Sequence, residues 1–188
     1  MTTNKHPSST IKLALMAAIA VASVGLCASS QAAQASATAT ATASGTVVAP
    51  IAIAATANLA FGSLAPGAGG NVTVSTSGVR ASTGPILLGG APSSAARFHI
   101  TGQADSTYTI THSGTAVLTN TTGSGGETMA LTKFSDLTGA NGTSGSATSG
   151  TLDILGSQTL FVGGSIAVAS NQVAGVYTGT VTATVEYN

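Results

Sequence analysis

The sequence is poor in charge, in aromatic side chains and in cysteine. Of its 188 residues only 5% are charged and 4% aromatic, tryptophan is absent, and Cys27 is the single cysteine. Charged residues make up about 25% of an average globular domain. Five lysines and arginines balance five acidic residues, so the chain offers no basic field to hold a nucleic-acid backbone. We therefore expect no nucleic-acid partner.

Small and hydroxyl-bearing residues make up much of the remainder. The chain holds 24 glycines and a large share of threonine. Both residues are poor in helix interiors, threonine because it loses side-chain freedom there and glycine because it loses more backbone entropy. Hydrophobic residues still make up 43% of the chain, enough for a domain of about 150 residues to bury a core. The composition predicts a single all-β domain.

The first 35 residues have the three-part layout of a secretory signal peptide. Lys5 and Lys12 precede the apolar run LALMAAIAVASVGLCA, and small residues follow it. The run is shorter than the roughly 20 residues that span a bilayer, so we expect export and cleavage, with no transmembrane segment in the mature chain. Cleavage after Ala32 and cleavage after Ala35 both fit the small-x-small rule, and both remain open.

Loss of the signal peptide would also remove Cys27, because this residue lies upstream of both cleavage frames. The mature chain would then carry no thiol, which excludes disulfides and thiolate-bound metals. Its three basic and five acidic residues give a net charge of 3 − 5 = −2. Hydroxyl groups must therefore supply most of its solubility.

Residues 36–48 alternate between small apolar residues and mostly threonine or serine, a period-two pattern typical of a β-strand. Pro50 lacks a backbone donor and so separates this extension from the domain, which we place at residues 49–188. One face of the extension holds Ala37, Ala39, Ala41, Ala43 and Val47. Three interpretations remain open: a strand donated to another molecule, a first strand in the domain's own sheet, and a disordered linker.

Eight short apolar alternations follow, separated by clusters of glycine, serine and asparagine. They cover residues 58–64, 71–76, 85–90, 96–102, 108–114, 128–134, 157–169 and 175–188. Frequent short strands with turn residues between them are typical of a β-sandwich or barrel. The stretch 139–150 is almost wholly small and polar, and we expect it to form a surface loop.

The C-terminal segment has the clearest strand pattern. One of its faces holds Tyr177, Gly179, Val181, Ala183, Val185 and Tyr187, and the other holds threonines and Glu186. This alternation indicates one face in the core and one in water. No residues after Asn188 remain to pair with the outer edge of the strand, and an unpaired edge invites pairing with another chain. An ordinary strand of a closed sandwich is the alternative.

This segment resembles the assembly motif of chaperone-usher pilins. Gly175 is the fourteenth residue from the end, apolar residues alternate after it, and Tyr187 is penultimate. The segment NLAFG at 58–62 is similar to the early segment of the archaic type of these subunits, which includes spore coat protein U-like domains. Most of the mature chain also resembles an uncharacterised secreted family, domain of unknown function 4402.

The resemblance implies an incomplete immunoglobulin-like β-sandwich that lacks its seventh strand and so has a hydrophobic groove. A periplasmic chaperone would fill the groove first, and at an outer-membrane usher the N-terminal extension of another subunit would replace it. Residues 36–48 would then be the donor strand. The acceptor groove and assembly motif would comprise Gly175, Tyr177, Val181, Ala183, Val185 and Tyr187. This mechanism is β-strand addition between chains.

Catalytic and cofactor sites have little support in the sequence. His99 and His112 lie in strand-like segments, and Asp105 and Ser113 are nearby in sequence. These are the residue types of a hydrolytic triad. The G-x-S-x-G nucleophile elbow is absent, and the two histidines lack a third ligand for zinc. No glycine cluster matches a phosphate loop. We predict a non-enzymatic protein without cofactor or metal.

The sequence thus predicts a secreted structural subunit of a surface fibre, a fimbrium or pilus of the kind used in cell adhesion. It would cross the inner membrane and the periplasm, and its partners would be other copies or sibling subunits, a periplasmic chaperone and an outer-membrane usher. The alternative is a self-complemented secreted or surface β-sandwich binding protein that does not polymerise.

Overall fold

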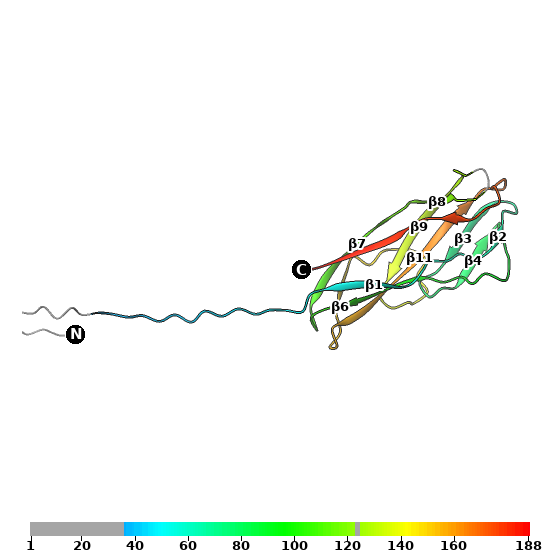
Figure 1. The fold of residues 1–188 in the computed structure, drawn as a ribbon. Helices are drawn as coiled ribbons and strands as arrows, with labels where there is room; N and C mark the ends of the chain where they lie inside the picture. Colours follow the sequence, from blue (N-terminus) through cyan, green and yellow to red (C-terminus); the bar gives the residue numbers. More distant parts are fainter. Residues whose placement is uncertain (1–35, 123–124) are drawn as a thin grey trace, which may run out of the picture. The chain divides into compact units, whose positions relative to one another are not determined.

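The computed structural model describes residues 36–122 and 125–188, so the predicted signal peptide, with Cys27 and both cleavage frames, lies outside the described residues. The chain divides into two units after Ser44, and all described strands belong to the second unit, Gly45–Asn188. No helix occurs among the described residues, which confirms the all-β prediction. Figure 1 shows how the strands of this second unit are arranged.

Thirteen strands follow one another along the described chain. Their bounds are β1 Ala52–Ala57, β2 Leu64–Ala65, β3 Gly70–Val74, β4 Arg80–Thr83, β5 Ile86–Leu87, β6 Ala96–Thr101, β7 Thr107–Gly114, β8 Val117–Asn120, β9 Thr128–Asp136, β10 Ser149–Thr151, β11 Ser157–Val168, β12 Tyr177–Thr178 and β13 Val181–Tyr187.

The larger sheet is antiparallel and has the order β1-β6-β11-β9-β8-β12, with β3 and β4 joined to it through β11. The 12-residue strand β11 is its centre. Successive parts of β11 pair with β6 and with β3, and β9 pairs with the middle of the strand. At one end of the sheet order, β1 pairs with β6 alone.

A smaller antiparallel sheet has the order β10-β7-β13, and β2 and β5 form a separate two-stranded ribbon. Buried side chains from β6, β7, β11 and β13 form one core cluster, and those from β3, β9 and β11 form another with Phe61. Sheet packed on sheet around an apolar interior is the β-sandwich architecture that the sequence predicts.

Alternation explains why these segments are strands. On β6, Ala96, Phe98 and Ile100 are buried, and the single residue that follows each of them is exposed. Burying a large apolar side chain such as that of Ile100 contributes about 1.5–3 kcal/mol. On β13, Ala183 and Val185 are buried while the threonines and Glu186 are exposed, so the predicted two-faced pattern is confirmed there.

The last predicted strand, 175–188, is interrupted at Gly179 and Thr180, and its two parts belong to different sheets. β12 pairs with β8 of the larger sheet and β13 pairs with β7 of the smaller one. A Cβ atom added at Gly179 would lie 2.6 Å from Thr115 Oγ1 and 2.7 Å from Leu118 Cδ2. Glycine at this position therefore lets the chain pass closely between the sheets.

The sequence pattern predicted one strand that the structure lacks and failed to predict three short strands. Residues 58–63 form no regular strand and contribute only an isolated bridge between Ala60 and Ser94. The short strands β4, β8 and β10 were not predicted, because their side chains do not alternate clearly. Of the predicted surface loop 139–150, residues 139–148 lie in no strand and are mostly exposed, whereas Ser149 and Gly150 belong to β10.

Candidate functional site

The most distinctive feature of the sandwich is the seam between β1 and β13. β1 pairs only with β6, and β13 pairs only with β7. Each strand therefore has one edge without a ladder partner among the described residues. Unpaired backbone N–H and C=O groups along such edges are templates for another strand. In Figure 1, β1 lies near the C-terminal strand on this side of the unit.

An apolar groove of about 960 Å³ lies at one end of this seam. One wall is formed by residues 57–66, which follow β1, and the other by residues 172–179 and Val181. Core side chains form the floor, namely those of Phe98, Leu118, Met129, Leu131 and Ile166. The lining includes no lysine, arginine, histidine, aspartate or glutamate.

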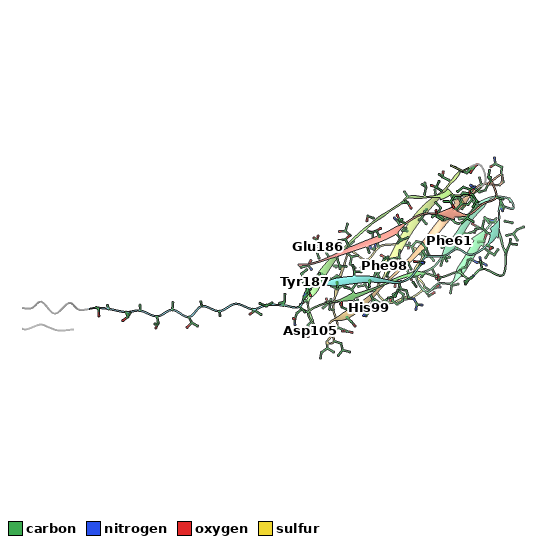
Figure 2. The ribbon with its side chains drawn as sticks, in the orientation of Figure 1. Phe61, Phe98, His99, Asp105, Glu186 and Tyr187 are labelled. Atoms are coloured by element: carbon green, nitrogen blue, oxygen red, sulfur yellow. The ribbon has the colours of Figure 1, made fainter. Side chains whose placement is uncertain are left out.

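The segment after β1 forms its wall by placing alternate side chains toward the interior. Phe61 is buried in the second core cluster, and Leu59 packs against both clusters. The Arg80 guanidinium holds the backbone here, because its Nη1 donates to Phe61 O at 2.8 Å and its Nη2 donates to Leu88 O at 3.0 Å. Figure 2 labels Phe61 and Phe98 inside the sandwich.

Hydrogen bonds also fix the opposite wall. Tyr177 Oη donates to Val173 O at 2.7 Å and accepts from Gln172 Nε2 at 2.7 Å. Gly175 packs directly against the buried amide side chain of Asn120, so any larger residue there would displace that amide. The wall is therefore a braced loop.

The predicted acceptor residues divide into three groups in the structure. Gly175, Tyr177 and Val181 line the groove. Ala183 and Val185 do not line it and are buried in the first core cluster farther along β13. Tyr187 packs partly against the same cluster at the far end of the strand.

Tyr187 anchors the point at which the extension joins the domain. Its Oη donates to Ala49 O at 2.8 Å and accepts from Gln103 N at 2.6 Å. Gln103 Oε1 in turn accepts from Ala49 N at 3.4 Å. In Figure 2, Tyr187 and Asp105 are labelled together at this end of the strands. The root of the extension is thus tied to the end of the seam opposite the groove.

The predicted donor residues lie in a segment without regular structure. Residues 36–50 belong to no strand and are all exposed. Val47, the largest predicted donor side chain, is 97% exposed. None of the predicted donor residues is therefore part of a strand.

The histidines are held in structural contacts. His112 Nε2 lies 2.8 Å from Ala147 O and 3.1 Å from Ser135 Oγ. His99 is on the exposed face of β6, and no hydrogen bond joins it to Asp105 in the described part of the chain. No cluster of three or more potential metal ligands occurs among the described residues.

Two carboxylates brace loops away from the groove. Burial opposes ionisation of Asp136, but hydrogen bonds from Thr76, Gly139 and Thr138 outweigh it and hold its pKa below the ordinary value. Asp153 accepts from Ser157 N at 2.8 Å and from Leu155 N at 2.9 Å, and these bonds lower its pKa. Both groups stabilise turns.

Comparison with known proteins identifies the family. Residues 51–187 match the family described as a domain of unknown function, DUF4402. The chain belongs to the DUF4402 family. No curated protein and no solved structure shows a match to this DUF4402 protein. Its described residues include no helix of the length and apolar character that crossing a membrane requires.

Sequence reasoning missed half of the groove in this DUF4402 domain. Ala55, residues 57–66 and the pair Ala91 and Pro92 line it but were not among the predicted site residues. The available signal was the alternation of Leu59 and Phe61, followed by Pro66 and Gly67 at a turn. Because the pattern resembles a strand, it did not reveal a groove wall.

Proposed function

We propose that this DUF4402 protein is a structural subunit of a surface fibre, in which the N-terminal extension of one copy fills the groove of the next by donor-strand exchange. The observation that carries the proposal is the combination of two unpaired strand edges beside an uncharged apolar groove with an exposed extension that pairs with neither. The predicted signal peptide supports export, followed by passage through the periplasm to the cell surface.

The groove suits binding better than catalysis. Its lining offers no carboxylate or imidazole for proton transfer, and apolar walls with free backbone edges match an incoming strand. A strand from a second copy would satisfy the edge of β13 and cover the core side chains of the groove floor. A periplasmic chaperone is the proposed temporary occupant, and an outer-membrane usher is the proposed site of exchange.

Backbone hydrogen bonds would contribute more to binding of the donor strand than its small side chains. Four donor alanines contribute roughly 3 kcal/mol if each buries one CH₂-sized group, and Val47 contributes about 1.5–3 kcal/mol. About ten backbone hydrogen bonds at roughly 0.5–1.5 kcal/mol each can exceed both, before the entropy of ordering the strand is subtracted. Small donor side chains suit a groove whose wall already directs Leu59 and Phe61 toward the interior.

Deletion of residues 36–48 tests the proposal. The deleted protein should fold, because all described strands lie in Gly45–Asn188, and should form no filaments in electron micrographs in which the undeleted mature protein does. A synthetic peptide with the sequence of residues 36–48 should bind the deleted protein and raise its melting temperature.

A monodisperse monomer from the undeleted protein, with no response of the deleted protein to the peptide, would contradict the proposal. That result would favour the self-complemented binding protein. A peptide in which Ala39 and Ala41 are replaced by aspartate is the matched control, because charge on the inward face cannot enter an uncharged groove without a large desolvation cost.

A further inference from the structure

Two large aliphatic side chains are presented to solvent at the tip of the β10–β11 turn. Ile154 is 79% exposed and Leu155 is 86% exposed. Turn positions usually carry glycine, proline, asparagine, aspartate or serine. Apart from Val47 in the extension, they are the most exposed large hydrophobic side chains of the described residues, so the pair calls for a specific explanation.

The turn holds these side chains outward. Asp153 Oδ1 accepts from Leu155 N at 2.9 Å and from Ser157 N at 2.8 Å. Gly156 N donates to Asp153 O at 2.8 Å, and Gly102 N donates to Gly156 O at 2.9 Å. Because the backbone is fixed on both sides, Ile154 and Leu155 cannot collapse onto their own domain.

The same end of the domain carries the root of the extension. Asp105 N donates to Asp153 O at 3.3 Å, which joins the turn to the loop after β6. That loop is joined through Gln103 to Tyr187 and Ala49. We call this end, made of Ala49, Tyr187 and the turns 102–106 and 152–157, the extension pole.

Exposed apolar side chains also gather at the other end. Val173 is 43% exposed and Val176 is 57% exposed, and both line the rim of the groove. Ile86 is 57% exposed. Its side chain lies close to Gly67, and Gly69 in the same turn lies close to Ser170. We call this end, made of residues 66–70, 84–88 and 169–176, the groove pole. In Figure 1 the β10–β11 turn and the β11–β12 connection lie at opposite ends of the strands.

Strand direction decides which poles meet in a fibre. β13 begins at Val181 on the groove wall and ends at Tyr187 on the extension pole. Antiparallel pairing is the more stable arrangement. A donor strand antiparallel to β13 therefore runs from the extension pole to the groove pole of the acceptor, and its C-terminal residues lie at the groove pole. Only Ala49 and its neighbours separate residue 48 from the donor's own domain, so its extension pole must lie against that groove pole.

We propose that Ile154 and Leu155 of one copy dock on the rim formed by Val173 and Val176 of the next copy, as a second contact that reinforces each joint of the fibre. This inference rests on the proposed function and adds to it. The contact is heterologous, since different surfaces of the two copies meet, and contacts of this kind propagate into open filaments.

The test uses fibres of the full mature chain and follows the release of subunits in heated detergent. Joint replacement of Ile154 and Leu155 by serine should accelerate release at least about tenfold, and so should joint replacement of Val173 and Val176. The two pairs combined should act no more strongly than either alone, because the contact is already lost. Val79→Ser, at a residue 59% exposed and in neither pole, is the control and should leave release within about twofold.

The outcomes separate the two proposals. If the wild-type chain forms no fibres, the proposed function and this inference both fail. If fibres form and the Ile154 and Leu155 variant releases subunits at the wild-type rate, or the two pairs act additively, this inference alone fails. The melting temperature of the free subunit should be unchanged by the Ile154 and Leu155 replacements, and a fall would contradict an outward-facing docking pair.

Discussion

Tyr187 shows how one side chain near the C-terminus can set the course of the N-terminal segment. Its hydroxyl both donates to Ala49 and accepts from Gln103, so a single oxygen joins three separate parts of the chain. A resemblance to a motif with a penultimate tyrosine pointed to this residue. The contact itself could not be predicted, because it joins residues 138 positions apart.

Replacement Tyr187→Phe should lower the free energy of unfolding by about 1–2 kcal/mol, since two hydrogen bonds are lost while the ring remains. Chemical denaturation of the mature protein measures this change. Thr182→Val, on the exposed face of the same strand, is a suitable control and should change stability little. Equal stability of the Tyr187→Phe variant and the wild type would show that the hydroxyl does not anchor the extension.

Asp136 makes the stability depend on pH. Its pKa is held below the unfolded value, so the carboxylate stabilises the fold above the unfolded pKa, and this contribution is lost as the pH falls through the folded pKa. The free energy of unfolding should therefore decline on acidification below about pH 4. In Asp136→Asn the decline should be smaller, and stability at pH 7 lower by about 1 kcal/mol.

Thermal denaturation across this pH range tests that expectation. Glu186→Gln provides the comparison, because the Glu186 side chain is exposed and makes no hydrogen bond within the described residues. Parallel pH profiles for the wild type and Asp136→Asn would refute the role given to the Asp136 carboxylate.

At the scale of elements, the sequence predicted long alternating strands well and short or irregular ones poorly. Segments 96–102, 108–114 and 128–134 correspond closely to β6, β7 and β9, because burial on one face repeats every second residue. Residues 58–63 have the same period yet form a groove wall. Their backbone is held by Arg80 and by the bridge to Ser94, which are distant contacts that no local pattern encodes.

The sequence also could not predict that the chain changes sheet between β12 and β13. The alternation continues through Gly179 without a break, and only the close approach to Thr115 and Leu118 shows why the strand divides there. A glycine inside a strand pattern is a known sign of such an approach, but it does not say which way the chain turns.

Replacement Gly179→Ala should destabilise the domain by about 1–3 kcal/mol, because the added Cβ would lie under 3 Å from two side-chain atoms. Gly89→Ala is the matched control, since a Cβ there meets nothing within 4 Å. Equal melting temperatures for the two variants would mean that the chain can widen the crossing at no cost.

At the scale of the whole molecule, the two ends of the domain have different tasks in the proposed fibre. One end anchors the extension through Tyr187, and the other opens into the groove beside Tyr177. The fold class and the identity of the C-terminal strand were predictable from composition and alternation. The groove and the exposed turn at Ile154 were not, because both arise from contacts between loops far apart in the sequence.

Disulfide trapping between an extension and a groove is the most direct measurement of this account. The mature chain is expected to carry no cysteine, so Val181→Cys can be combined with one further cysteine in the extension. Directly opposite residues of an antiparallel strand pair have Cα atoms about 4.5–5.5 Å apart, which lies within the range of about 4.4–6.8 Å that a disulfide can span. The second cysteine is placed in turn at Ala37, Ala39, Ala41, Ala43 or Val47, and in the controls at Thr38, Thr40 or Thr42.

We expect at least one inward-facing position to give a ladder of covalent multimers on a non-reducing gel, and the threonine positions to give little. The same bond formed only within single molecules, seen as a faster-migrating monomer with no ladder, would contradict the central claim that a second copy supplies the missing strand.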